Sequence, residues 1–321
     1  MNSRLASDLN IGRRKLRLGE RTLIMGVLNV TPDSFSDGGL YLDPASATEH
    51  GLDLVRQGAD WIDVGGESTR PGSQPVSAEE ELRRVLPVVK ALRRKLRVTP
   101  ISVDTTKAEV AEKAVEAGAN ILNDISGLRF DPRLAEVARR HKIPLILTHI
   151  RGRPETMQTR PFAVDIVQSV ARGLATSVRR ALAAGLRRSQ LILDPGLGFG
   201  KSRIQNFQLL SHLGKLRRFG LPILVGSSRK SFVQAVAAGT GLRGGTQQAP
   251  SVKGATSYWP MMETPVRARH GVSLLAGDAA AVVAAILAGA HIVRVHEVEA
   301  ILPAVRIADA VLEAGSRPVG R

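Results

Sequence analysis

The chain has 321 residues, of which 43% are hydrophobic and 23% charged, a composition that excludes a disordered or collagen-like chain. It contains no cysteine, which excludes disulfide scaffolds, thiolate catalysis and cysteine-ligated zinc or iron–sulfur sites. Lys and Arg number 45 against 29 Asp and Glu, a formal charge of +16, and such a balance attracts phosphorylated substrates, nucleic acids or anionic membranes.

The positive charge is spread along the chain rather than gathered in one stripe. Arginine doublets recur from Arg13-Arg14 to Arg217-Arg218, mostly in amphipathic segments, which is typical of solvated helix faces. Aromatic residues make up only 3%, too few for stacking on single-stranded nucleic acid. No apolar run reaches the roughly 18 residues of a membrane span, and residues 1–21 lack the apolar core of a signal peptide. We expect a cytoplasmic protein with no nucleic-acid or membrane partner.

Short apolar runs alternate with longer amphipathic segments along most of the chain. This alternation of strand and helix predicts an α/β protein with the (β/α)8 TIM barrel fold. The expected strands are residues 22–30, 61–64, 101–103, 121–122, 145–148, 191–193, 223–225 and 292–295, and expected helices include 78–96, 106–117, 132–141, 164–184 and 279–288.

One barrel domain accounts for most of the sequence. We assign residues 21–315 to the barrel, residues 1–20 to a basic N-terminal extension, and residues 316–321 to a C-terminal tail. Residues 238–270, rich in Gly and Pro and without helical periodicity, are predicted to be an irregular loop inserted before the last helix–strand unit.

Polar residues follow every predicted strand. In a barrel of parallel strands the carboxyl ends meet at one rim, where active sites form, so we expect these side chains to share a site. Any one of them could instead cap a helix or satisfy a turn. They are Asn29 after the first strand, Thr69, Arg70 and Pro71 after the second, then Asp104, Asn123, His149, Asp194, Lys230 with Ser231, and finally Arg294 with His296.

These residues divide into two chemical groups. Lys230, Arg294 and His296 can surround an anion such as a phosphate or diphosphate. Carboxylates and amides suit a flat heterocycle that presents ring N–H and amino groups, because a carboxylate accepts two parallel hydrogen bonds from such an edge. Asp104, Asn123 and Asp194 form this second group.

Two other patterns are weak. The Gly-rich segment 196–201, which ends in Lys201, resembles a phosphate-binding loop but lacks the spacing of the known nucleotide motifs. His149 and His296 have no paired metal-ligand spacing, so we expect no zinc site.

Five motifs occur in one order: residues 29–38 (NVTPDSFSDG), 66–72 (GESTRPG), 194–201 (DPGLGFGK), 228–231 (SRKS) and 294–296 (RVH). Together they resemble the dihydropteroate synthase family over residues 22–302. The chain departs from the family pattern in two places: Thr148-His149-Ile150 stands where Met-His-Met is common, and Glu297 follows His296 where Asp is usual.

The resemblance implies a folate-pathway transferase that is a sulfonamide target. Its members join 6-hydroxymethyl-7,8-dihydropterin diphosphate to 4-aminobenzoate and release diphosphate with the help of Mg²⁺, and a homodimer is expected. The resemblance also implies the site roles. Asp104, Asn123, Asp194 and Lys230 would bind the pterin; Asn29, Thr69, Arg70, Arg294 and His296 the diphosphate; Arg70, Pro71, Phe199, Lys230 and Ser231 the aminobenzoate; Asn29 the metal; and Asp104, Lys230 and Arg70 would serve catalysis.

Two alternative functions stay open. A corrinoid-linked pterin methyltransferase would share the pterin-binding carboxylates but would not need a diphosphate anchor, so Lys230, Arg294 and His296 favour the synthase. A catalytically silent paralogue would bind pterins without turnover, and only an assay with both substrates distinguishes it.

Overall fold

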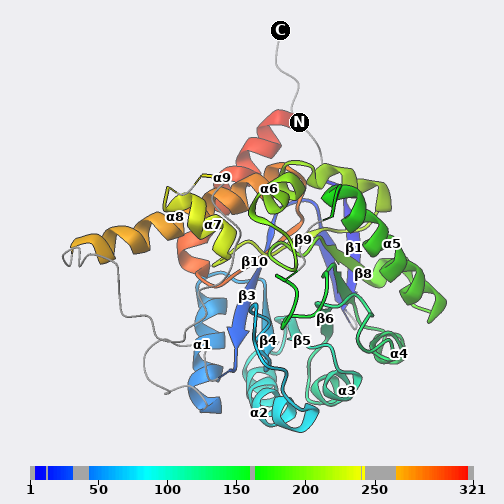
Figure 1. Ribbon diagram of the computed structural model, residues 1–321. Helices are drawn as coiled ribbons and strands as arrows, with labels where there is room; N and C mark the ends of the chain where they lie inside the picture. Colours follow the sequence, from blue (N-terminus) through cyan, green and yellow to red (C-terminus); the bar gives the residue numbers. More distant parts are fainter. Residues whose placement is uncertain are drawn as a thin grey trace.

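The computed structural model describes residues 4–11, 14–31, 43–159, 163–239, 241–242 and 265–316. Figure 1 shows the parallel strands at the centre and the helices around them. Eight strands form one sheet in the order β8-β7-β6-β5-β4-β3-β10-β9. A parallel bridge between Leu193 and Ile223 joins the two edges, so the predicted (β/α)8 TIM barrel is confirmed. The barrel strands are β3 Leu23–Asn29, β4 Trp61–Gly65, β5 Ile101–Asp104, β6 Ile121–Asp124, β7 Leu145–Thr148, β8 Leu191–Asp194, β9 Leu224–Val225 and β10 Ile292–Val295.

The helices begin where the sequence supplies capping groups. The Oγ atoms of Ser77 and Ser202 accept hydrogen bonds from the backbone N–H groups of Glu80 and Gln205, as expected for N-caps. No helix in the part of the chain described is long and apolar enough to cross a membrane. The helices are α1 Pro44–Arg56, α2 Ala78–Lys95, α3 Ala108–Glu116, α4 Leu134–His141, α5 Ile166–Ala183, α6 Arg203–Ser211, α7 Ser231–Ala237, α8 Pro265–Leu287 and α9 Val298–Ser316, with short 3₁₀ helices at Arg188–Gln190 and Leu213–Phe219.

The strand residues alternate between two hydrophobic clusters. In β3, Ile24 and Leu28 pack in the cluster that the strands share with the surrounding helices, whereas Leu23 and Met25 belong to a second cluster. This second cluster also contains Trp61, fully buried, and apolar residues from β6 to β10. Side chains on alternate faces of a barrel strand point inward and outward, so the second cluster fills the interior of the barrel near the amino ends of its strands.

The first described residues close that end of the barrel. Strands β1 (Ser7–Ile11) and β2 (Arg14–Leu18) form an antiparallel hairpin. Its buried residues Leu9, Ile11 and Leu18 complete the interior cluster. The basic N-terminal extension assigned to residues 1–20 therefore contains a hairpin that packs on the barrel, because alternating apolar side chains lie between its basic residues and need burial.

The predicted insertion is shorter than expected. Helix α8 begins at Pro265, so residues 265–270 are helical and not part of an irregular loop. Residues 243–264 of the insertion lie outside the described residues, as do residues 32–42, which include most of the first motif.

We expect Leu18→Ala to lower the free energy of unfolding by about 2–5 kcal/mol, because the substitution leaves a cavity at the closed end of the barrel. Urea denaturation followed by circular dichroism measures the change. Lys15→Ala is the matched control on the same strand, since its side chain is mostly exposed and its ion pair with Asp8 is at the surface. Equal midpoints for Leu18→Ala and Lys15→Ala would contradict the assignment of the hairpin to the core.

Candidate active site

A cavity of about 580 Å³ opens at the carboxyl ends of the barrel strands. It is lined by both groups of predicted residues, the cationic and the carboxylate group, which come from loops and strand ends far apart in the sequence. Asn123 and His149 do not line the cavity, and both are buried. The predicted residues that line it are Asn29, Thr69, Arg70, Pro71, Asp104, Asp194, Phe199, Lys230, Ser231, Arg294 and His296.

Arg294, on β10, connects two carboxylates at the base of this cavity. Its Nε donates to Oδ2 of Asp63 at 2.7 Å, and its Nη2 donates to Oδ2 of Asp104 at 3.0 Å. Asp63 is fully buried, and it also accepts hydrogen bonds from Ser102 Oγ at 2.5 Å and Asn123 Nδ2 at 3.0 Å. Each oxygen of Asp63 therefore has a donor, as a buried carboxylate requires.

Asp63 has no role in the sequence-based prediction. It lies in the middle of the completely buried strand β4, where an ionised group is rare unless it has a charged partner. That position is the signal that could have revealed it. Through Asp63, the structure places Asn123 under Arg294 rather than at the cavity wall.

Burial shifts the pKa values of Asp104 and Lys230 in the cavity wall. It raises the pKa of Asp104; Arg294 opposes this increase and the charge of Asp63 adds to it. Burial also lowers the pKa of Lys230 to about 8, with repulsion from Arg294 acting in the same direction. The Nζ atom of Lys230 lies 4.1 Å from the ring centroid of Phe199, a distance at which a cation–π interaction stabilises the ammonium group.

Asp194 ends β8 and faces the same cavity. Burial raises its pKa to about 6, against the opposing hydrogen bond from the backbone N–H of Gly196. That N–H lies 2.7 Å from Oδ1 of Asp194. Asp194 is thus a carboxylate near neutral pH, held in place by the backbone of the loop that follows it.

Lys201 holds this loop and does not face the cavity. Its fully buried ammonium group donates to the carbonyl oxygens of His149, Gly196 and Phe199 at 3.1, 2.7 and 3.0 Å. Gly196 has φ +67°, and a Cβ there would lie 2.0 Å from the carbonyl oxygen of His149, so only glycine allows this approach. Lys201 therefore does not act as the lysine of a phosphate-binding loop.

His296 and Ser228 lie together on the cavity wall that also contains Arg294. The Nδ1 atom of His296 lies 3.2 Å from Ser228 Oγ. Burial, followed by repulsion from Arg294, lowers the pKa of His296 well below its ordinary value, so the imidazole is neutral and can donate one N–H. Asp278 of α8 accepts hydrogen bonds from Ser228 Oγ and from the backbone N–H of Arg229, which fixes this loop.

The loop that carries Thr69, Arg70 and Pro71 is anchored by Lys107. The Nζ atom of Lys107 lies 2.6 Å from Glu67 Oε2 and 2.6 Å from Oε2 of Glu81, which is fully buried. The other oxygen of Glu67 accepts a hydrogen bond from the backbone N–H of Val76. The Glu67 side chain therefore links the start of the loop to its end at Val76.

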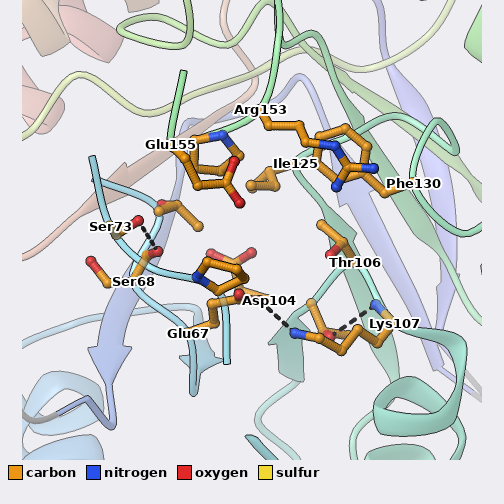
Figure 2. Close-up of a pocket in the computed structure, with 14 residues that line it drawn as sticks. Glu67, Ser68, Ser73, Asp104, Thr106, Lys107, Ile125, Phe130, Arg153 and Glu155 are labelled. Carbon is orange, nitrogen blue, oxygen red and sulfur yellow. Dashed lines mark hydrogen bonds and ion pairs between the residues drawn. The ribbon is translucent and has the colours of Figure 1, made fainter. Parts of the chain in front are cut away.

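A smaller pocket of about 110 Å³ lies beside this anchor and shares Asp104 with the main cavity. Figure 2 shows Glu67 and Lys107 joined across it, with Ser73 bonded to Ser68 next to them. Because Ser73 Oγ donates to the carbonyl of Ser68 at 2.6 Å, the loop is also closed on itself between the two anchored ends.

Residues 25–296 match the family described as pterin binding enzyme. The chain belongs to the family of pterin-binding enzymes. This pterin-binding enzyme is 43% identical to a dihydropteroate synthase of Synechocystis sp. over 303 residues, 94% of each chain. The dihydropteroate synthase of Xanthomonas albilineans with 4-aminobenzoic acid has 38% identity and a TM-score of 0.79, covering 98% of this chain and 100% of that one. The same enzyme in complex with 7,8-dihydropteroate gives 35% identity, a TM-score of 0.75 and coverages of 97% and 100%.

We expect Lys107→Met to lower the free energy of unfolding of this pterin-binding enzyme by about 3–5 kcal/mol, because it leaves the carboxylate of Glu81 buried without its cation. The double variant Lys107→Met/Glu81→Met removes both charges and should recover most of that loss. Urea denaturation of the wild type, both single variants and the double variant measures the coupling. Additive losses would show that the pair does not act as a unit.

Proposed function

We propose that the chain is a dihydropteroate synthase, which condenses 6-hydroxymethyl-7,8-dihydropterin diphosphate with 4-aminobenzoate to give 7,8-dihydropteroate and diphosphate. The observation that carries the proposal is one cavity in which carboxylates for a heterocycle and cations for an anion face each other. The related proteins are named dihydropteroate synthases, and two of their solved structures contain 4-aminobenzoic acid and 7,8-dihydropteroate.

In this proposal the pterin binds against Asp104, Asp194 and Lys230. A carboxylate at Asp194 accepts the two parallel hydrogen bonds of an N–H/NH₂ edge, and the adjacent Lys230 donates to a ring acceptor. Asn123 takes part through Asp63 and the base of the site, since its amide nitrogen is already bonded there.

In this proposal the diphosphate binds against Arg294, His296, Thr69 and Arg70. During the reaction the bond between the pterin methylene carbon and the diphosphate oxygen breaks, and a bond to the amine nitrogen of 4-aminobenzoate forms. The amine loses a proton, and the electron pair of the broken bond leaves with the diphosphate. Fixed cations at the diphosphate end stabilise that developing negative charge.

The charge on the other side of the transition state is positive and lies on the dihydropterin methylene. Asp104, next to Arg294, is the carboxylate at that end. Arg70, Pro71, Phe199, Lys230 and Ser231 form the wall where aminobenzoate would lie. The arylamine nitrogen carries a free electron pair near neutral pH, so the reaction requires no strong general base.

Magnesium is part of the proposal, and the donor chemistry of the cavity wall fits it. Asn29 offers an amide oxygen at the end of β3 on the wall of the cavity. Mg²⁺ commonly keeps several waters and takes one or two protein oxygens together with substrate phosphates, so a single oxygen ligand is sufficient. No cluster of three acidic or His residues suited to a metal exists within the described ranges. Bound Mg²⁺ would neutralise part of the charge on the diphosphate.

The homodimer and the cytoplasmic location expected from the sequence stay predictions. The methyltransferase alternative is disfavoured by Arg294, His296 and Lys230 around one cavity, since methyl transfer from a folate releases no diphosphate. The silent-paralogue alternative is decided by turnover alone.

The decisive experiment incubates the protein with the pterin diphosphate and labelled 4-aminobenzoate, with and without Mg²⁺, and follows labelled dihydropteroate by chromatography. We expect product that depends on both substrates and increases with Mg²⁺. Arg294→Gln should reduce the rate by roughly 10²-fold or more, as for the loss of a donor that stabilises transition-state charge. A folded wild-type protein that forms no product would leave the silent paralogue as the function.

The pKa of Asp194 sets the pH dependence of pterin binding. Since the carboxylate is the form that accepts from the pterin, affinity for 6-hydroxymethylpterin should be nearly constant from about one pH unit above this pKa upward. Below pH 6 protonation competes with binding, and affinity should fall by about tenfold per pH unit. Asp194→Ala should weaken binding by about 1–3 kcal/mol at pH 7.5. Titration calorimetry between pH 5 and 7.5 measures both effects.

Asp194→Asn is the matched control, because it keeps the shape of the side chain and removes its titration. Its affinity should be weak and should lack the change near pH 6 that Asp194 gives the wild type. A wild-type affinity that stays constant down to pH 5 would show that Asp194 does not bind the pterin as a carboxylate.

A further inference from the structure

A second cavity, of about 330 Å³, lies outside the substrate cavity and shares none of its lining residues. Its wall is formed by the segment after β6, the segment after β7 and one face of α5. Nothing in the proposed reaction uses this cavity.

The charged side chains that line the second cavity are all basic. Arg129 and Arg151 contribute guanidinium groups, and no Asp or Glu belongs to the lining. Nη1 of Arg129 donates to the carbonyl oxygen of Ile150 at 2.5 Å, which leaves further N–H groups of its five for a ligand. Arg153 and Arg180 lie close enough to repel Arg129, adding to the effect of burial in lowering its pKa. The positive potential at this cavity is therefore not balanced by its own lining.

His149 adds an unused polar group to the same cavity. Its ring is largely buried, and its Nδ1 atom has no hydrogen-bond partner among the described residues. A buried polar atom without a partner costs free energy. Burial, followed by the charges of Lys201 and Arg129, lowers the pKa of His149 well below its ordinary value, so the ring is neutral and carries one N–H that can be donated.

Helix α5 keeps the cavity open with small residues. Ser169, Gly173 and Ser177 occur at intervals of four and therefore share one helix face, and all three line the cavity. A Cβ at Gly173 would lie 2.5 Å from Cδ2 of His149, so glycine is needed for the imidazole ring to occupy its position. The serine hydroxyls add short polar groups to a wall already rich in donors.

We propose that this cavity binds a small oxyanion of the phosphate class, held by Arg129 and Arg151, with the His149 ring as an additional donor. Guanidinium groups bind phosphate oxygens through paired, charge-assisted hydrogen bonds. Serine hydroxyls on α5 complete the ligand shell. The proposal does not depend on the activity of the substrate cavity, because the two cavities have separate walls.

The test uses inorganic phosphate and isothermal titration calorimetry on the full chain. The substrate cavity is also expected to take phosphate, so the informative quantity is the number of ions bound. Arg129→Gln removes charge from the second cavity, whereas Ser169→Leu fills it and leaves every charge in place. Arg172→Gln, an exposed position on α5 outside the lining, is the matched control.

We expect the wild type and Arg172→Gln to bind one phosphate more than Arg129→Gln and Ser169→Leu. All four proteins should form dihydropteroate within twofold of one another in phosphate-free buffer, since none of these residues lines the substrate cavity. Equal phosphate stoichiometry in the four proteins would overturn the proposal.

A crystal soaked in selenate locates the ion independently of any substitution. We expect an anomalous peak between the side chains of Arg129 and Arg151 and within hydrogen-bond distance of the His149 ring. Anomalous peaks confined to the substrate cavity and the outer surface would overturn the proposal as well, whatever the activity assay shows.

Discussion

The guanidinium of Arg294 pairs with two carboxylates at the base of the substrate cavity. It bonds to Asp63 and Asp104, which lie 231 and 190 residues away in the sequence, so it joins β10 to β4 and β5 inside the barrel. Removing one partner of a buried ion pair leaves an unpaired charge and is strongly destabilising. The cation that we propose for the diphosphate and the carboxylate that we propose for the pterin are therefore joined by a hydrogen bond, so a substitution of one also affects the other.

Three loops around the cavity are held by charged groups that do not face it. Lys107 binds Glu67 and Glu81 under the loop of Thr69 and Arg70. Lys201 binds three carbonyl oxygens of the neighbouring segments, and Asp278 binds the loop after β9. In each case a charged side chain outside the cavity lining holds a loop whose other residues line the cavity.

Much of this fold could be predicted from sequence because each barrel strand is a short, mainly apolar run with polar residues at its end or shortly after it. The expected strand 145–148 agrees with β7, and the ends of several other strands differ by one or two residues. The rim residues followed from the same pattern, since parallel strands carry their last residues to one edge. Their partners beneath the cavity did not follow, because contacts such as Asp63 with Arg294 depend on how strands far apart in sequence face one another.

The hairpin and Lys201 were missed for different physical reasons. In residues 7–18 each strand of the hairpin has only two apolar residues at alternate positions, with polar or basic residues between them. This pattern is too short to be distinguished from a polar tail. In the Gly-rich segment, a lysine that faces the protein interior and one that faces a ligand have the same sequence. Only the three carbonyl oxygens around Lys201, contributed by two separate segments, show which of them is present.

The closure of the barrel by the β1–β2 hairpin affects which end of the barrel substrates and products can use. Leu9, Ile11 and Leu18 fill the barrel interior at its amino end, and the substrate cavity lies at the carboxyl end. Within the described residues, the amino end is therefore not a route to the cavity. Diphosphate, aminobenzoate and the joined product all use the carboxyl end. The order in which substrates bind and products leave there therefore becomes part of the kinetics of the enzyme.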